Sequence, residues 1–266
     1  MRRRAIKLSL LFCLAPILLS CSPADAQQAD TPLQAQEPPP EAKRALDHLQ
    51  EANAALKSVR ARITYVRAIP LLDEKQKSRG ELIYKKPDHI ILKLGKPRNE
   101  EVYTNGKKWW VVSHETRQVE IYPVSDEANR EAAFLRFGYG EGSEGLLKDY
   151  SVELVSAGQE PAREKGKPPV QVRRLRFRPR RKKKPAPLYD AIEVEISSES
   201  WLPRQFVLHE GGFPGEIIHT YTLRDMRLDT KLKDKMFEYK PPRGYTVLRP
   251  SERADAASES KGGAVP

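Results

Sequence analysis

The feature that most constrains this chain is a series of short segments in which apolar and polar residues alternate. They follow one another from residue 60 to residue 227, and this alternation is typical of strands with one buried face. Turn sequences such as NGK at 105–107 separate them. About eleven short strands in succession predict a mainly β domain, a single antiparallel sheet curled towards a barrel. The predicted strands are 60–69, 80–86, 89–95, 100–104, 108–113, 118–122, 150–156, 170–178, 190–197, 203–209 and 216–227.

Two segments have a different periodicity. From Glu41 to Val59 apolar residues recur at steps of three and four, which predicts an amphipathic N-terminal helix. Residues 127–150 interrupt the strands with apolar side chains around a glycine cluster, which predicts one or two short helices with a flexible joint. The apolar side chains of this second segment include Phe134, Leu135, Phe137 and Leu146.

The N-terminal residues have the pattern of an export signal. MRRR precedes a short apolar run, so residues 1–20 are predicted to be a signal peptide. Cleavage before Cys21 would leave an acylated cysteine, whereas ADA at 24–26 fits ordinary cleavage after Ala26. Both interpretations stay open. The predicted domain at 41–250 then lies between a disordered tether at 21–40 and a disordered tail at 251–266.

The basic charge of the chain is concentrated in one place. The formal net charge is +11, and the segment from Arg163 to Lys184 alone holds twelve Lys or Arg residues and one acid, Glu164. The exported body outside this segment is therefore slightly acidic, which argues against a general nucleic-acid binder. The run Arg173–Lys184 is either a solvated hairpin protected by its charge or a contact for anionic headgroups or an acidic partner protein.

The sequence offers little for catalysis or cofactor binding. The five histidines lack metal-ligand spacing. The GEGSEG run at 140–145 matches G-x-G-x-x-G, but it follows an apolar segment instead of a strand, and Glu141 and Glu144 would repel a phosphate. The expectation is a protein that is not an enzyme and needs no cofactor or metal.

Three stretches carry a resemblance to a known family: GELIYKKPDHIILKL, then VYTNGKKWWVV with TRQVEIY, and finally DKMFEYKPPRGYTV. In order and spacing they resemble the bacterial outer-membrane lipoprotein carrier (Lol) family over roughly residues 41–248. The resemblance implies a bent, unclosed antiparallel β-barrel of eleven strands whose apolar lumen is covered by short lid helices. It also implies that the lumen holds the acyl chains of lipoproteins that cross the periplasm.

The resemblance places a basic residue at the lumen mouth, where it engages the lid, and by position this residue is Lys86. A lone inward lysine is costly to bury in a packed core, so Lys86 is expected at the rim of a cavity, unless it merely extends to water at the core edge. Trp110 holds the position of the family tryptophan. By strand phase, the expected lipid-binding residues with Lys86 and Trp110 are Leu82, Tyr84, Ile90, Leu92 and Leu94, which an ordinary filled core would also explain.

The leading functional hypothesis is a non-enzymatic carrier or acceptor of lipoproteins or lipids in the periplasm. It is expected to be a monomer that is anchored by lipid at Cys21. The expected location of the anchor is the outer membrane rather than the inner membrane. The alternative is an envelope-stress regulatory lipoprotein of the same fold that binds a protein partner. An enzyme ranks third, because no catalytic constellation is evident.

Overall fold

The computed structural model describes residues 38–124, 139, 147–162, 166–180 and 188–249. Within them a helix α1 (Pro40–Ala55) precedes a 12-stranded sheet. The strands are β1 (Ser58–Ile69), β2 (Glu74–Lys85), β3 (His89–Leu94), β4 (Glu100–Asn105), β5 (Lys108–Ser113), β6 (Gln118–Pro123), β7 (Tyr150–Glu160), β8 (Val170–Pro179), β9 (Ala191–Ser197), β10 (Pro203–Glu210), β11 (Ile217–Leu228) and β12 (Thr246–Leu248). Short 3-10 turns lie at η1 (Pro70–Leu72) and η3 (Asp234–Phe237).

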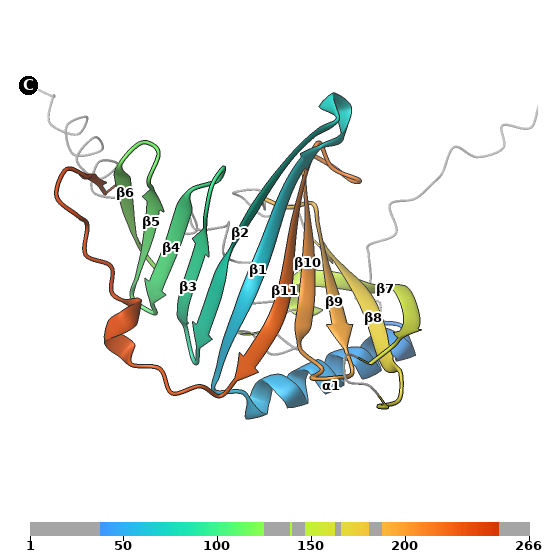
Figure 1. Ribbon diagram of the computed structural model, residues 1–266. Coiled ribbons are helices and arrows are strands. Elements are labelled where there is room, and N and C mark those ends of the chain that lie inside the picture. Colours follow the sequence, from blue (N-terminus) through green and yellow to red (C-terminus); the bar gives the residue numbers. More distant parts are fainter. Residues whose placement is uncertain (1–37, 125–138, 140–146, 163–165, 181–187, 250–266) are drawn as a thin grey trace, which may run out of the picture. The chain divides into compact units, whose positions relative to one another are not determined.

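The strand order is β12-β6-β5-β4-β3-β2-β1-β11-β10-β9-β8-β7, so β12 and β7 are the edges of a sheet that does not close (Figure 1). All eleven predicted strands are present, and the expected open sheet is confirmed. The prediction of a purely antiparallel sheet was wrong in one respect, because the short β12 pairs parallel with β6. Three residues without clear alternation gave no sequence signal for β12.

The predicted N-terminal helix is confirmed, although α1 ends earlier than the periodicity suggests. Its start is favoured by Pro40 at the first helical position and Glu41 in the first turn. It ends at Leu56, whose backbone is extended, because the next residues join the sheet. There Asp229 accepts a hydrogen bond from the Lys57 amide at 2.7 Å.

Each face of the sheet carries an apolar cluster. The face that α1 packs on, called here the helix face, has one continuous cluster across nine neighbouring strands, from β4 through β1 to β7. The opposite or outer face has a smaller cluster on β2–β6, covered by residues from Leu232 to Tyr245. Phe237 of η3 is fully buried there, so the C-terminal segment belongs to the fold.

Gly80 shows why the first motif begins with glycine. It pairs with Leu94 of β3, and a Cβ atom at Gly80 would lie 1.7 Å from the carbonyl oxygen of Lys93. Atoms cannot approach so closely, so any side chain would push β3 away from β2. The glycine is therefore required by the close backbone approach at the start of this pairing.

Candidate functional site

The helix face brings together the five apolar residues that strand phase predicts. Leu82 and Tyr84 on β2 and the three β3 residues are buried in the same cluster. Register explains this, because Leu82 pairs with Leu92 and Tyr84 pairs with Ile90, and paired residues share a face. The β3 members of the set are Ile90, Leu92 and Leu94. Their predicted role in binding lipid stays a prediction.

Trp110 lies away from these residues, on the outer face. It pairs with Tyr103, which pairs with Ile91, and all three belong to the outer cluster. The neighbouring Trp109 packs against the helix-face cluster instead. Grouping Trp110 with the lining residues therefore put it on the wrong face. Two adjacent tryptophans must point to opposite faces of a strand, and only the register across β3–β5 shows which one points inward.

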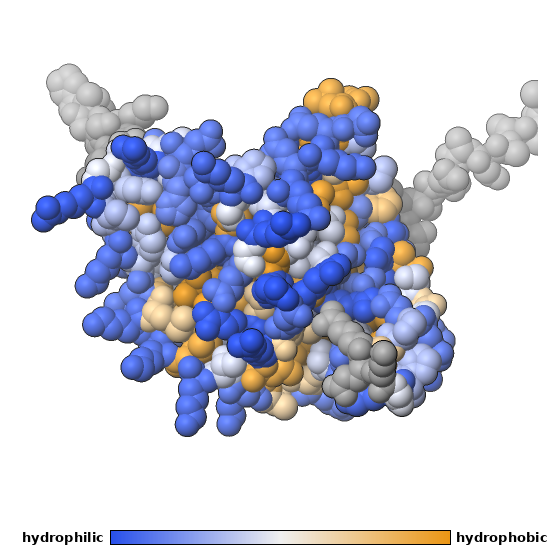
Figure 2. Space-filling model, in the orientation of Figure 1, coloured by the Kyte–Doolittle hydropathy of each residue, from blue (hydrophilic) through white to orange (hydrophobic). Residues whose placement is uncertain are grey.

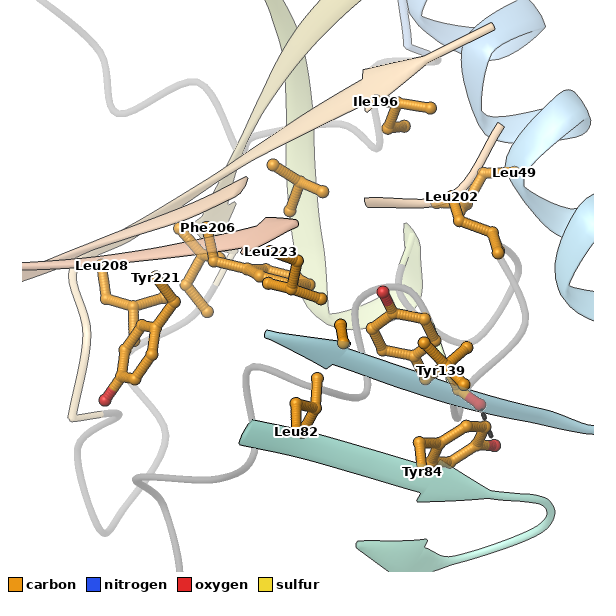
Figure 3. Close-up of a cluster of buried hydrophobic side chains, with 14 of the residues drawn as sticks. Leu49, Leu82, Tyr84, Tyr139, Ile196, Leu202, Phe206, Leu208, Tyr221 and Leu223 are labelled. Atoms are coloured by element: carbon orange, nitrogen blue, oxygen red, sulfur yellow. Dashed lines mark hydrogen bonds between the residues drawn. The ribbon is translucent and has the colours of Figure 1, made fainter. Parts of the chain in front are cut away.

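Tyr139 is buried in the helix-face cluster, beside Tyr84 (Figure 3). It belongs to the connection between β6 and β7, two strands near opposite edges of the sheet. Its side chain is 1% exposed, and its ring centroid lies 5.4 Å from that of Tyr84 and 6.4 Å from that of Phe206. The connection thus contacts both halves of the sheet through one buried aromatic residue.

Two hydrogen bonds hold Tyr139 in place. The Tyr84 hydroxyl donates to the Tyr139 carbonyl oxygen, and the Tyr139 hydroxyl donates to the Pro203 carbonyl oxygen at 3.1 Å. Burial raises the pKa of both phenols, so both remain protonated donors at neutral pH. Tyr139 thereby links β2 to β10 across the face. Sequence phase could not identify it, because its role depends on residues distant in the chain.

Lys86 contacts the end of α1. Its ammonium group donates to the Asn53 carbonyl oxygen and, at 3.1 Å, to the Ala54 carbonyl oxygen. The last carbonyls of a helix have no partner within the helix, and the dipole there attracts a cation. No basic residue lies in the last turn of α1, so Lys86 supplies that charge from the neighbouring loop. Lys86 thus caps α1, a pairing that strand phase alone cannot show, and its expected place at a cavity rim stays a prediction.

Several predicted sites lie outside the described residues. These are the acylation site Cys21 and the lid residues Phe134, Leu135, Phe137 and Leu146. The described end of the predicted lid, Leu147–Asp149, is helical. Leu147 packs against the helix-face cluster.

The alternating arginines of β8 lie on the outer face, where Arg174 and Arg176 are opposite glutamates of β9. Arg174 reaches Glu195 at 2.7 Å, and Arg176 reaches Glu193 at 2.8 Å and Glu153 at 2.7 Å. These ion pairs largely neutralise the charges of Arg174 and Arg176. This part of the basic run is therefore not a surface of unpaired cations. A contact through Arg173–Lys184 with anionic lipid or an acidic partner stays a prediction, and its last residues, 181–184, lie outside the described part of the chain.

Glu193 is the most strongly perturbed carboxylate of this network. The His209 ring, whose Nε2 lies 3.6 Å from a Glu193 carboxylate oxygen, and the Arg176 guanidinium, opposed by burial, together lower the pKa of Glu193 to about 2. The pair lies under the 211–216 loop, where the Phe213 ring packs on His209 and on the guanidinium of Arg176. The paired charges of Arg176 and Glu193, covered by the Phe213 ring, form a structural network that joins β8, β9 and β10.

Among the described residues no group of three metal-ligating side chains lies close enough to hold an ion. In the same part of the chain, none of the helices has the length and apolarity needed to cross a bilayer.

Known proteins were compared with this chain at three levels. No family model matches it, and no curated protein matches its sequence. Similar solved structures include an uncharacterized conserved protein from Thermus thermophilus (14% identity, TM-score 0.49, 79% of this chain and 99% of that one). A LolA superfamily protein from Nitrosomonas europaea is similar too (14%, 0.41, 74% and 97%). So is LprF from Mycobacterium bovis (11%, 0.40, 78% and 100%).

Proposed function

We propose that this protein is a non-enzymatic carrier or acceptor that shields the acyl chains of lipoproteins or lipids on its way across the bacterial periplasm. The observation that supports this most is the helix face itself. It is a continuous cluster of buried apolar side chains across nine strands of an open sheet. Tyr139, from the connection between β6 and β7, is buried in this cluster.

The energetics of acyl chains explain why such a surface is needed. A methylene removed from water is worth about 0.8 kcal/mol, so exposing a chain of about fifteen carbons costs on the order of 12 kcal/mol. An acylated protein therefore cannot cross an aqueous compartment unaided. A carrier must cover the chain and still release it, which requires a cover that opens at modest cost.

Tyr139 provides such a cover in this proposal. In the structure its ring packs on the helix face against the rings of Tyr84 and Phe206. Its displacement would open apolar surface on β2 and β10 for an acyl chain. The step breaks two neutral hydrogen bonds, each with a net worth of about 1 kcal/mol. Methylenes of the incoming acyl chain would replace the apolar contacts that the Tyr139 ring loses. The free-energy change of exchanging the ring for the acyl chain is therefore small.

The direct test is whether the purified protein holds acylated molecules. We expect extraction and mass spectrometry to find acyl-bearing ligands, and a fluorescent sixteen-carbon fatty acid to bind to the ligand-free protein. Tyr84→Phe removes the hydroxyl that holds the Tyr139 carbonyl and should accelerate uptake about fivefold, the effect of about 1 kcal/mol.

Tyr103→Phe is the matched control. Tyr103 is also a buried tyrosine, but it lies on the outer face, where its hydroxyl donates to Glu101 at 2.6 Å. It should bind the probe like the parent. A protein that never carries or binds an acyl chain would refute the proposed function.

Export and anchoring form a separate part of the proposal. We infer acylation at Cys21 from the lipobox LLSC at 18–21 and expect cells to label the protein with a palmitate analogue. Cys21→Ala should abolish the label. Equal labelling of both forms would refute an anchor at this residue.

A further inference from the structure

The β1–β2 hairpin has an apolar tip that is open to solvent. Leu71 is 92% exposed and Leu72 is 66% exposed, the two largest values among the exposed large apolar residues of the described chain. Figure 2 shows an apolar patch at the tip of this hairpin, above a hydrophilic stem. Adjacent leucines that are this exposed indicate a contact surface, whereas single exposed apolar residues are common.

The tip is built to project. Beyond Ala68, which pairs with Ile218, β1 has no further partner on β11, and the β2–β3 pairing starts only at Gly80. The last part of the hairpin therefore stands free of its neighbours (Figure 1). Pro70 begins the 3-10 turn, and the Asp73 amide donates to the Pro70 carbonyl oxygen at 3.2 Å. This turn holds both leucines at the end of the hairpin.

Cations line one side of the stem below the leucines. Lys75, Lys77 and Arg79 are exposed and alternate along β2, so they share one face of the strand. No ion pair joins any of them to a carboxylate of the described chain. Residues 67–79 hold four basic and two acidic side chains.

We propose that this tip contacts the surface of a bilayer that contains anionic phospholipid. Leu71 and Leu72 would enter the boundary between headgroups and acyl chains, and Lys75, Lys77 and Arg79 would lie at the level of the phosphates. The charge favours lipid over a second copy of this chain, because pairing two tips would bring like charges together. The inference does not depend on the proposed cargo, since the tip lies outside the helix-face cluster.

The test is flotation of the full chain with unilamellar vesicles. Cys21→Ser is introduced in every variant, so that no acyl anchor contributes and any signal-peptide contribution is common to all. The vesicles contain either phosphatidylcholine alone or a mixture of roughly 7:3 phosphatidylcholine and phosphatidylglycerol. The second lipid is anionic and should attract basic segments. We expect Leu71→Ser with Leu72→Ser to lower partitioning onto the mixed vesicles about tenfold or more. Lys75→Glu with Lys77→Glu should do the same on mixed vesicles and have little effect on pure phosphatidylcholine.

Matched controls separate the tip from general effects. Val155→Ser changes another exposed apolar residue (38% exposed), and Lys107→Glu with Lys108→Glu changes exposed cations at the β4–β5 turn. Both should bind within about twofold of the parent, and all variants should keep the parent melting temperature, because the changed side chains are exposed.

Partitioning of the leucine variant within twofold of the parent would overturn the proposal. So would a leucine variant that changes the mass in light scattering without changing vesicle binding, because the tip would then join two copies. Equal binding of the glutamate variant to mixed vesicles would overturn the role of anionic lipid. Fatty-acid uptake is measured in parallel, so that failure of the cargo proposal and failure of the tip proposal appear in different assays.

Discussion

Replacing Lys86 by methionine tests whether this residue serves the fold or a ligand. The change keeps the length of the side chain but removes the ammonium group that donates to the Asn53 and Ala54 carbonyl oxygens. A hydrogen bond from a charged group contributes about 1.5–3 kcal/mol when buried, and a cation at a helix end about 0.3–1 kcal/mol. Because the site is partly open to water, which can hydrate the freed carbonyls, we expect a loss of about 2 kcal/mol in the free energy of unfolding.

That loss is measurable in two ways. For a domain of this size, 1 kcal/mol corresponds to about 2–4 °C in Tm, so Lys86→Met should melt about 4–8 °C lower. In urea the midpoint should fall while the slope stays constant. Lys86→Arg keeps the charge and should lose less than half as much. Lys93→Met, which removes an exposed ammonium 3.9 Å from Glu101, should cost less than about 1 kcal/mol.

The refuting result is a Lys86→Met protein as stable as the parent. If such a protein also took up the fluorescent fatty acid differently, Lys86 would act at a cavity mouth, as the family resemblance implies. A drop in Tm without a change in uptake supports the capping of α1.

Three further changes test the network, the outer cluster and the motif glycine. Because the pKa of Glu193 is about 2 in the folded protein against 4.5 unperturbed, its stabilising effect is complete above pH 4.5 and lost as the pH falls towards 2. The stability difference between the parent and Glu193→Gln should therefore shrink from about 3 kcal/mol at pH 6 to near zero at pH 2 in urea titrations, and a constant difference would contradict the assignment. Phe237→Ala should cost about 3–5 kcal/mol in urea unfolding, against less than 1 kcal/mol for Leu71→Ala at a residue that is 92% exposed; similar values would show that the C-terminal segment does not pack as described. Gly80→Ala should cost several kcal/mol because of the contact with the Lys93 carbonyl, whereas a Cβ at Gly158 meets nothing within 4 Å and Gly158→Ala should leave Tm unchanged; an unaffected Gly80→Ala protein would refute the close approach.

Most strands could be predicted because alternation is a local property of each segment. The start of β2 was missed by six residues, since Glu74–Arg79 is polar and charged and has no apolar alternation, although it pairs with β1. β12 was missed for a similar reason. Its three residues are held by β6, and nothing within them favours a strand.

The candidate site was predicted where strand phase decides it and missed where distant contacts decide it. Leu82, Tyr84 and the β3 residues share a face by alternation. Trp110 needed the register of three strands. Tyr139 and the partners of Lys86 needed the folded chain, because Tyr84 and Tyr139 are 55 residues apart.

The kinds and places of the elements could be predicted from the amino-acid sequence, because propensity and periodicity act within a few residues. The sequence also located the excess of basic residues and the glycine at position 80. The folded chain was needed to show which tryptophan points inward, which carboxylates neutralise the arginine stripe, and that a lysine after β2 caps the first helix. These arrangements depend on strand register and on close packing of distant segments. A shift of one residue in the register of a strand would move its side chains to the opposite face of the sheet.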